Sequence, residues 1–228
     1  MFRIFFGYTE IMRTIPREVR DFMRIKTSFS LSEKQKSVLI GTILGDGSLK
    51  IRGKHYRLHI KHSYNQRSLV VYKRKIFSNI TNMPIRVFFQ KVKNKDYKFC
   101  EFVTLTHTEF SKYHEMFYKN GRKTITNVIL KEFTDPLSLA IWFMDDGCAE
   151  YAGVSFNTQC FSLKEVGILV KMLKENFKIY STVRKNKNGW IVYIPKNNLI
   201  IFKSMVEKYI LPNFKYKLIP YSIKSLTP

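Results

Sequence analysis

Two Asp-Gly pairs in this sequence are placed so that together they could hold a metal ion. Asp46-Gly47 ends the apolar stretch LIGTILGDG, and Asp146-Gly147 ends the stretch LAIWFMDDG, 100 residues later. A carboxylate in the last turn of a helix lies at the negative end of the helix dipole, which costs about 0.3–1 kcal/mol. A bound divalent cation would compensate that charge better than a distant lysine, and Mg²⁺ prefers such oxygen ligands. One Asp-Gly pair is more often a plain turn, but two at matched positions favour a metal site.

The two apolar stretches are predicted to be helices that bring these acids together. The first has a capping signal at Ser32 with Gln35 three residues later, and the second starts at Asp135 before a proline. Each helix ends at Asp-Gly, where we expect the glycine to adopt the left-handed conformation. A further acid, Asp145, precedes the second pair. Small residues would let the two helix backbones pack closely, namely Gly41, Gly45 and Ala140.

The segments that follow each motif repeat one order of elements. In the first copy we expect strands at 48–52 and 55–62, a helix at 66–80, a hairpin of 85–91 with 97–105, a helix at 108–117 and a basic tract at 121–125. In the second we expect a short segment turning at Gly153 into a strand at 154–161, a helix at 162–177, a hairpin of 180–185 with 190–194, a helix at 197–209 and a basic tract at 214–218. A capping box of Ser162 and Glu165 marks the start of the helix at 162–177. The order α-β-β-α-β-β-α occurs twice, which predicts an α+β fold of two pseudo-twofold related αββαββα subdomains, residues 31–130 and 134–228.

The composition identifies the class of partner. The chain has 40 Lys+Arg against 17 Asp+Glu, a net charge of +23, and 45% of its 228 residues are hydrophobic. It is therefore a folded basic protein rather than a disordered tail, and we expect a polyanion partner. No apolar run has the length of a membrane span, and the three cysteines show no zinc or disulfide pattern. Residues 1–30 contain acids that transit peptides avoid, so we expect an ordinary N-terminal extension there.

The repeated segments resemble a known family. LIGTILGDG and LAIWFMDDG are similar to the two motifs of monomeric LAGLIDADG homing endonucleases, and SLAIWFMDDG, FNTQCF, NGRKTI and YILPNFKYKL resemble the omega-type organellar intron endonucleases in particular. The resemblance covers about residues 31–220. It implies motif helices at the interface of the two subdomains and two antiparallel sheets that form a saddle over double-stranded DNA.

The resemblance also implies roles for individual residues. Asp46 and Asp146 take the position of the family's catalytic acids, which would bind two or three shared Mg²⁺ ions, with Mn²⁺ as a substitute. Lys123 and Lys217 take the position of the basic active-site residue. Gln159 matches a water-organising residue of some members, whereas the first copy has Ser63 near the equivalent place.

Alternating side chains on the predicted strands supply candidates for DNA binding. Arg, Gln and Asn can read base edges in the major groove, and lysines are better suited to phosphates. For any single residue, the alternative to DNA contact is an ordinary solvent-exposed position on a strand. The candidates in the first half are Lys50, Arg52, Lys54, Arg57, His59, Lys61, Arg86, Gln90, Lys91 and Lys93. Those in the second half are Tyr151, Asn157, Arg184, Lys185, Asn186, Lys187 and Tyr193.

These observations lead to one expected function and one alternative. We expect a monomeric, Mg²⁺-dependent endonuclease, encoded in a mitochondrial or chloroplast intron, that makes a double-strand break in a long asymmetric DNA target and so promotes intron mobility. The alternative is a group I intron RNA maturase with the same fold, for which intron RNA would be the partner. A basic ribosomal or architectural protein would not account for the repeated acids at the helix ends. We expect no membrane partner.

Overall fold

The computed structural model describes residues 29–220, so nearly all of the expected N-terminal extension and the last eight residues lie outside the description. The first half contains α3 (Glu33–Leu44), β1 (Ser48–Arg52), β2 (His55–Ser63), α4 (Arg67–Ile76), β3 (Arg86–Val92), β4 (Lys95–Val103), α5 (Thr108–Phe117), β5 (Tyr118–Lys119) and β6 (Arg122–Lys123). A short helix, α6 (Ile129–Glu132), follows. The second half contains α7 (Pro136–Asp146), β7 (Gly147–Glu150), β8 (Gly153–Phe156), α8 (Leu163–Phe177), β9 (Thr182–Asn186), β10 (Gly189–Pro195), α9 (Lys196–Val206) and the 3₁₀ helix η4 (Pro212–Leu218).

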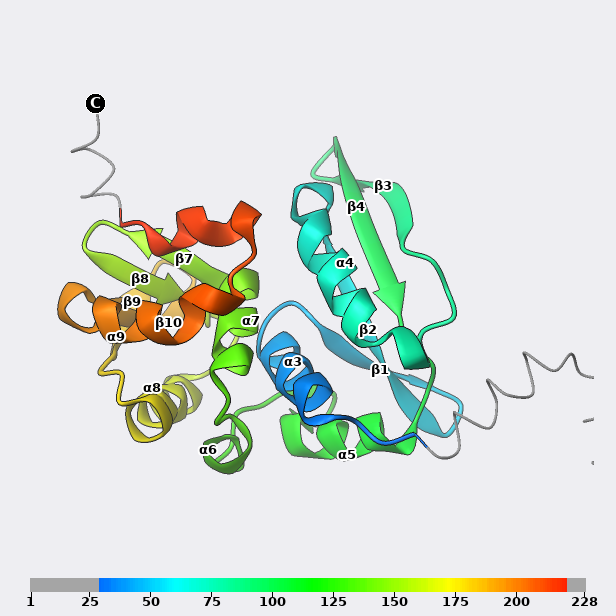
Figure 1. The fold of residues 1–228 in the computed structure, drawn as a ribbon, viewed down its shortest axis with the longest axis horizontal. Coiled ribbons are helices and arrows are strands. Elements are labelled where there is room, and N and C mark those ends of the chain that lie inside the picture. The colour runs from blue at the N-terminus through cyan, green and yellow to red at the C-terminus, as the bar shows by residue number, and fades with distance from the viewer. Residues whose placement is uncertain (1–28, 221–228) are drawn as a thin grey trace, which may run out of the picture.

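The two halves share one sheet topology. The first sheet has the order β1-β2-β4-β3 and the second β7-β8-β10-β9, with every neighbouring pair antiparallel. The α+β fold expected from the sequence is confirmed. In Figure 1, α3 and α7 lie side by side at the centre, with the first sheet on one side and the second sheet on the other. Among the helices of the described range, none is long and apolar enough to cross a bilayer.

The sequence signals at the helix starts act as expected. Ser32 and Gln35 form a capping box at α3, and Ser162 with Glu165 forms another at α8. The Asp135 side chain accepts a hydrogen bond from the Leu137 N–H at the start of α7. Each of these caps satisfies backbone donors that have no partner within the helix.

The ends of the motif helices differ from the expectation. Gly47 and Gly147 were predicted to be left-handed, but neither has a positive φ, and Gly147 has φ −71° and ψ 146°. Lack of space explains both glycines. A Cβ added at Gly47 would lie 2.3 Å from the Thr42 side chain, and one at Gly147 would lie 2.2 Å from the Phe143 ring. The chain must fold back against its own helix at these points, and only glycine leaves room for it.

The motif helices touch through their backbones. A Cβ added at Gly41 would lie 2.4 Å from the carbonyl oxygen of Ser138, and one at Gly45 would lie 2.4 Å from Cβ of Asp145. Around this contact α7 is almost entirely buried: Trp142 stacks on Phe156 at 3.9 Å between ring centroids, and Phe143 packs edge-on against Phe202. The helix ends that carry the acids are therefore fixed by the core of the protein.

Candidate active site

Asp46 and Asp146 lie at the ends of the paired motif helices, α3 and α7. Asp146 is the last residue of α7 and Asp46 lies two residues after the end of α3. Burial, followed by the negative charges of Asp46 and Asp145, raises the pKa of Asp146 to about 8. The charged form of Asp146 is therefore disfavoured by its buried surroundings and by the two neighbouring acids. A divalent cation would favour the charged form, and carboxylate oxygens are suitable ligands for it.

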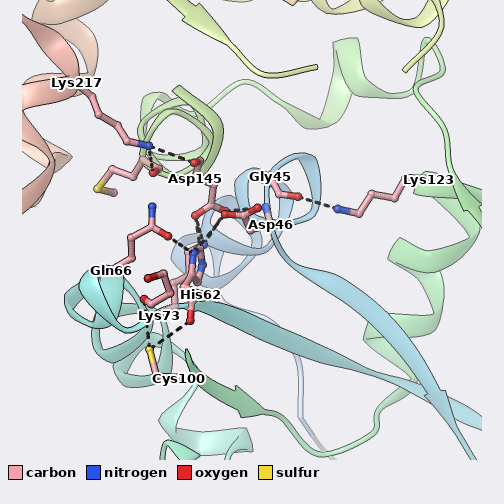
Figure 2. A network of polar contacts seen from close by, with 11 residues as sticks. Gly45, Asp46, His62, Gln66, Lys73, Cys100, Lys123, Asp145 and Lys217 are labelled. Carbon is pink, nitrogen blue, oxygen red and sulfur yellow. Dashed lines mark hydrogen bonds and ion pairs between the residues drawn. The ribbon is translucent and has the colours of Figure 1, made fainter. Parts of the chain in front are cut away.

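Two lysines donate to the backbone at the ends of the same helices. Lys123 Nζ donates to the Gly45 carbonyl oxygen at 2.8 Å, and Lys217 Nζ donates to the Met144 carbonyl oxygen at 2.7 Å. Figure 2 shows them approaching from opposite sides. Burial lowers the pKa of both ammonium groups. Each cation lies at the negative end of a helix dipole, which favours it there. The repeat thus supplies one lysine to each helix end.

A third lysine, which the sequence analysis did not identify, neutralises Asp145. Lys73 of α4 is fully buried, and its Nζ donates to both carboxylate oxygens of Asp145, at 2.6 and 2.7 Å. For Asp145, then, the expectation that a bound cation would outperform a distant lysine is wrong. A sequence signal did exist, because Lys73 lies on the apolar stripe that α4 buries with Leu69 and Val70.

His62 connects Asp145 with Asp46. Its Nδ1 lies 3.3 Å from Oδ2 of Asp46 and 3.1 Å from Oε1 of Gln66, whereas Nε2 lies 3.6 Å from Oδ1 of Asp145. Figure 2 shows the imidazole between the two aspartates. Burial, followed by the charge of Lys73, lowers the pKa of His62, which favours the neutral ring. Oxygen acceptors thus lie beside both ring nitrogens, and those beside Nδ1 are the nearer ones. In the sequence, His62 continues the buried alternation of Leu58 and Ile60.

The side chain predicted to organise water lies beside the second hairpin. Gln159 Nε2 donates to Oδ1 of Asn157 at 3.3 Å, and a Cβ added at Gly189 would lie 2.8 Å from the Gln159 carbonyl oxygen. The backbone N–H of Asn157 donates to the Asp146 carbonyl oxygen at 2.9 Å. The backbone of Asn157 is thus bonded to the end of α7, and the side chain of Gln159 is connected to that helix end only by way of Asn157.

The first sheet presents most of its predicted DNA-binding residues on one face. Leu58 and Ile60 of β2 point into the core, so the alternate residues point outward. Directly paired residues share a face, and Lys50 pairs with Arg57, while Arg86 and Lys61 both pair with Glu101. Lys61 also donates to Gln90. The outer face therefore carries Lys50, Arg52, Arg57, His59, Lys61, Arg86 and Gln90.

The second sheet has a different set on its outer face. Tyr193 pairs with Ser155, and Ile191 pairs with Arg184. Arg184 and Asn186 are two residues apart on β9 and therefore lie on the same face of the sheet. The Arg184 guanidinium stacks on the Tyr193 ring at 3.2 Å from its centroid. The two outer faces therefore do not repeat each other, as an asymmetric partner requires.

The remaining predicted contacts lie at strand ends or on the opposite face. Lys93 lies in the β3–β4 turn with φ 49°, Lys54 in the β1–β2 turn and Lys187 in the β9–β10 turn. Tyr151 is 74% exposed in the β7–β8 turn. By the register, Lys91 and Lys185 point to the face opposite Gln90 and Arg184. For these two lysines, contact with DNA requires the edge of the sheet rather than its outer face.

Comparison with known protein families and sequences gives a consistent result. A family model described as "LAGLIDADG DNA endonuclease family" matches residues 36–202. The chain is 34% identical over 196 residues to cytochrome b mRNA maturase bI2 of Saccharomyces cerevisiae, a match that covers 80% of this chain but only 46% of the maturase. It is 30% identical over 212 residues to probable intron-encoded endonuclease 1 of Wickerhamomyces canadensis, covering 88% of this chain and 90% of that protein.

Solved structures agree with this. The homing endonuclease I-WcaI, determined bound to its DNA recognition sequence, superposes with a TM-score of 0.82 at 29% identity, covering 91% of this chain and 94% of I-WcaI. I-DmoI, determined in complex with DNA and Mn, superposes with a TM-score of 0.50 at 14% identity and shows the same fold.

Proposed function

The chain belongs to the LAGLIDADG DNA endonuclease family, and from this membership we propose that it is a homing endonuclease that cuts both strands of one long, asymmetric DNA site. One observation carries the proposal. Asp46 and Asp146 lie at the ends of two helices that pack backbone to backbone, and each helix end receives a lysine ammonium group, from Lys123 or Lys217. Paired carboxylates with flanking cations are the groups that phosphodiester hydrolysis requires.

We propose Mg²⁺ as the cofactor, with Mn²⁺ as a substitute, held by Asp46 and Asp146. The pKa of about 8 at Asp146 supports this, because burial and the neighbouring acids disfavour a charged carboxylate there, and a bound cation would stabilise it. When bound, the cations would activate the attacking water and stabilise the leaving 3′-oxygen. The chain itself supplies orientation and charge: the carboxylates fix the ion positions, and the two lysine ammonium groups polarise the scissile phosphate or order the water around it.

The two outer sheet faces are the proposed DNA-binding surface. Arg57, Arg86 and Gln90 of the first half, and Arg184 and Asn186 of the second, are proposed to read base edges. Lysines of the same faces and of the turns are proposed to hold phosphates, which explains the excess of basic residues. I-WcaI, at 29% identity, was determined on its DNA recognition sequence. That relative supports a DNA target for this fold.

Several coarser features complete the proposal. The chain would act as a monomer, because it contains both motif helices. Residues 31–130 and 134–228 would form the two pseudo-twofold subdomains, and residues 1–30 an extension. Relatives named "intron-encoded endonuclease" support an intron as the coding context, and we propose that this intron is organellar, mitochondrial or chloroplast.

A maturase activity is the second candidate, because two relatives above 30% identity are named cytochrome b mRNA maturase bI2. A splicing factor of this fold would bind intron RNA and would not need two intact helix-end acids. Both acids are present here, which favours cleavage.

A plasmid assay tests the proposed function. The target is the sequence made by joining the two DNA flanks of the intron, cloned in a supercoiled plasmid. We expect linear product in Mg²⁺ or Mn²⁺ and none in EDTA. Asp46→Ala and Asp146→Ala should each lower double-strand cleavage by about 10³-fold, since a metal ion contributes several kcal/mol to the transition state.

The same two variants should still bind the joined-flank duplex in a gel-shift assay, because neither acid lies on the outer sheet faces. An intact plasmid with the wild-type protein, together with restored splicing of the intron RNA, would favour the maturase. Full cleavage by either alanine variant would contradict the assignment of the acids.

A further inference from the structure

A buried ion pair next to Asp46 joins the two halves of the protein. Lys73 comes from α4 of the first half, and Asp145 comes from α7 of the second. Both side chains have no exposed surface. A buried ammonium without a partner is strongly unfavourable, and here both carboxylate oxygens of Asp145 accept from it. The pair therefore fixes the end of α7 against α4.

Asp145 reaches the first half because the matching position there is a glycine. Gly45 precedes Asp46 as Asp145 precedes Asp146. A Cβ on Gly45 would lie 2.5 Å from Oδ2 of Asp145, so the carboxylate fills the space that the missing side chain leaves. From there Oδ2 accepts the backbone N–H of Asp46 at 3.3 Å. The second motif helix thus supports the catalytic acid of the first.

His62 holds the side chain of the same acid. Its Nδ1 lies 3.3 Å from Oδ2 of Asp46, and its ring is fully buried between that carboxylate and Asp145. Gln66 accepts at the same nitrogen, at 3.1 Å. The Asp46 carboxylate, which is 44% exposed, therefore has a fixed partner on its inner side.

The second half is built differently at the matching positions. Ser48 pairs with His59 in the first sheet and Cys148 pairs with Ser155 in the second, so Thr158 corresponds to His62. Thr158 Oγ1 donates to the Trp190 carbonyl oxygen at 2.9 Å, so its hydroxyl group binds the β9–β10 hairpin. The helix that corresponds to α4 is α8, and its buried residues are all apolar: Val166, Leu169, Met172, Leu173 and Phe177.

A metal ion is the competing explanation for this cluster. One candidate ligand atom each from Asp46, His62 and Asp145 lie within 4.8 Å of one another. However, Lys73 already engages both oxygens of Asp145. A cation bound there would face an ammonium group, so the lysine takes the place of a metal at this position.

We propose that Lys73, Asp145 and His62 form a positioning network that fixes the Asp46 carboxylate as a metal ligand, and that residues 29–220 contain no counterpart of this network for Asp146. The inference rests on the proposed endonuclease function. Groups that orient a metal ligand raise metal affinity about 10–100-fold. The two metal-binding acids are therefore unequal: Asp46 is held in place before metal binds, and Asp146 is not.

The test measures metal binding directly, by electron paramagnetic resonance of free Mn²⁺ titrated with protein. Two variants remove the network: Lys73→Met/Asp145→Asn, which leaves no unpaired buried charge, and His62→Leu. We expect Mn²⁺ affinity to fall about tenfold in both. His62→Gln keeps a donor for Asp46 and should recover most of the affinity. Thr158→Val, the matched change in the second half, should leave it unchanged.

Circular dichroism and melting curves verify that each variant is folded. The half-saturating Mg²⁺ concentration for plasmid cleavage should rise in the same order as the Mn²⁺ dissociation constant. Unchanged Mn²⁺ affinity in both folded network variants, or an equal loss in Thr158→Val, would overturn the inference. If the wild-type protein leaves the plasmid intact, the proposed function fails instead, and the Mn²⁺ measurements still test the network.

Discussion

At the scale of single residues, charge decides the properties of the site. Asp146 lies near Asp46 and Asp145, and burial together with these charges raises its pKa to about 8. Asp145 is neutralised internally by Lys73, and Asp46 is partly exposed to solvent. The three acids of one small centre therefore have three different environments, although the sequence presents them only as members of two similar motifs.

The raised pKa of Asp146 predicts how stability and metal binding depend on pH. Between about pH 4 and pH 8 the folded protein without metal holds a proton on Asp146 that the unfolded chain releases. This contribution to stability is complete below pH 4 and is lost as the pH rises to about 8, at up to about 1.4 kcal/mol per pH unit. Metal binding must displace the same proton, so affinity for Mg²⁺ should increase over this range.

Melting curves from pH 5 to pH 9 would measure both effects. In EDTA, the wild-type melting temperature should fall relative to that of Asp146→Asn as the pH rises. The expected fall is roughly 2–4 °C for each kcal/mol of unfolding free energy that is lost. In Mg²⁺, the wild-type gain in melting temperature should increase with pH, and Asp146→Asn should lose this trend. Parallel curves for the two proteins would show that Asp146 titrates as an ordinary carboxyl.

At the scale of elements, the contact of α3 with α7 determines where the acids lie. The two helices approach so closely that Gly41 has no room for a Cβ beside the Ser138 carbonyl oxygen. The contact is made by backbone, which cannot change rotamer to make space. The close approach of the two helices therefore requires small residues at this interface.

Gly41→Ala should consequently destabilise the protein, although alanine is the better helix former. Overpacking typically costs about 1–3 kcal/mol, against about 1 kcal/mol gained from helix propensity. Gly167→Ala in α8 is the matched control, because a Cβ there meets nothing within 4 Å and should stabilise the helix. Thermal unfolding in EDTA measures both. Equal melting temperatures for the two variants would mean that the motif helices separate without cost.

At the scale of the whole molecule, the net charge of +23 is organised around an acidic centre. Arginines and lysines lie on the outer faces and turns of both sheets, whereas Asp46, Asp145 and Asp146 lie between the halves. Such a layout would attract the DNA backbone from a distance and leave Asp46 and Asp146 for the proposed cations.

The salt dependence of DNA binding tests this layout. Lys50→Ala should weaken binding about equally for all sequences and reduce the slope of log K against log salt by about 1, whereas Arg57→Ala should cost about 1–3 kcal/mol at one base pair. Lys171→Ala on α8 is the control, because α8 packs against the core side of the second sheet, away from the proposed DNA-binding face. Lys171 Nζ lies 3.8 Å from Oε1 of Glu175 on the same helix. Fluorescence anisotropy of the joined-flank duplex in increasing KCl measures all three. An unchanged slope for Lys50→Ala would remove it from the DNA interface.

Features that depend on local pattern could be predicted from the amino-acid sequence. The capping residues Ser32, Asp135 and Ser162, the alternation of β2 and the repeat of Asp46 at Asp146 are set by neighbours a few residues away or by internal similarity, so the α+β fold and the paired acids could be predicted. The tertiary structure alone decided which partners meet over long distances. Lys73 and Asp145 are 72 residues apart in the chain. Glycine is required at the ends of the two motifs because a Cβ there would clash with the preceding helix, and not because the turn needs a left-handed residue. Pairing and close approach are properties of the packed core, and one-dimensional spacing does not encode them.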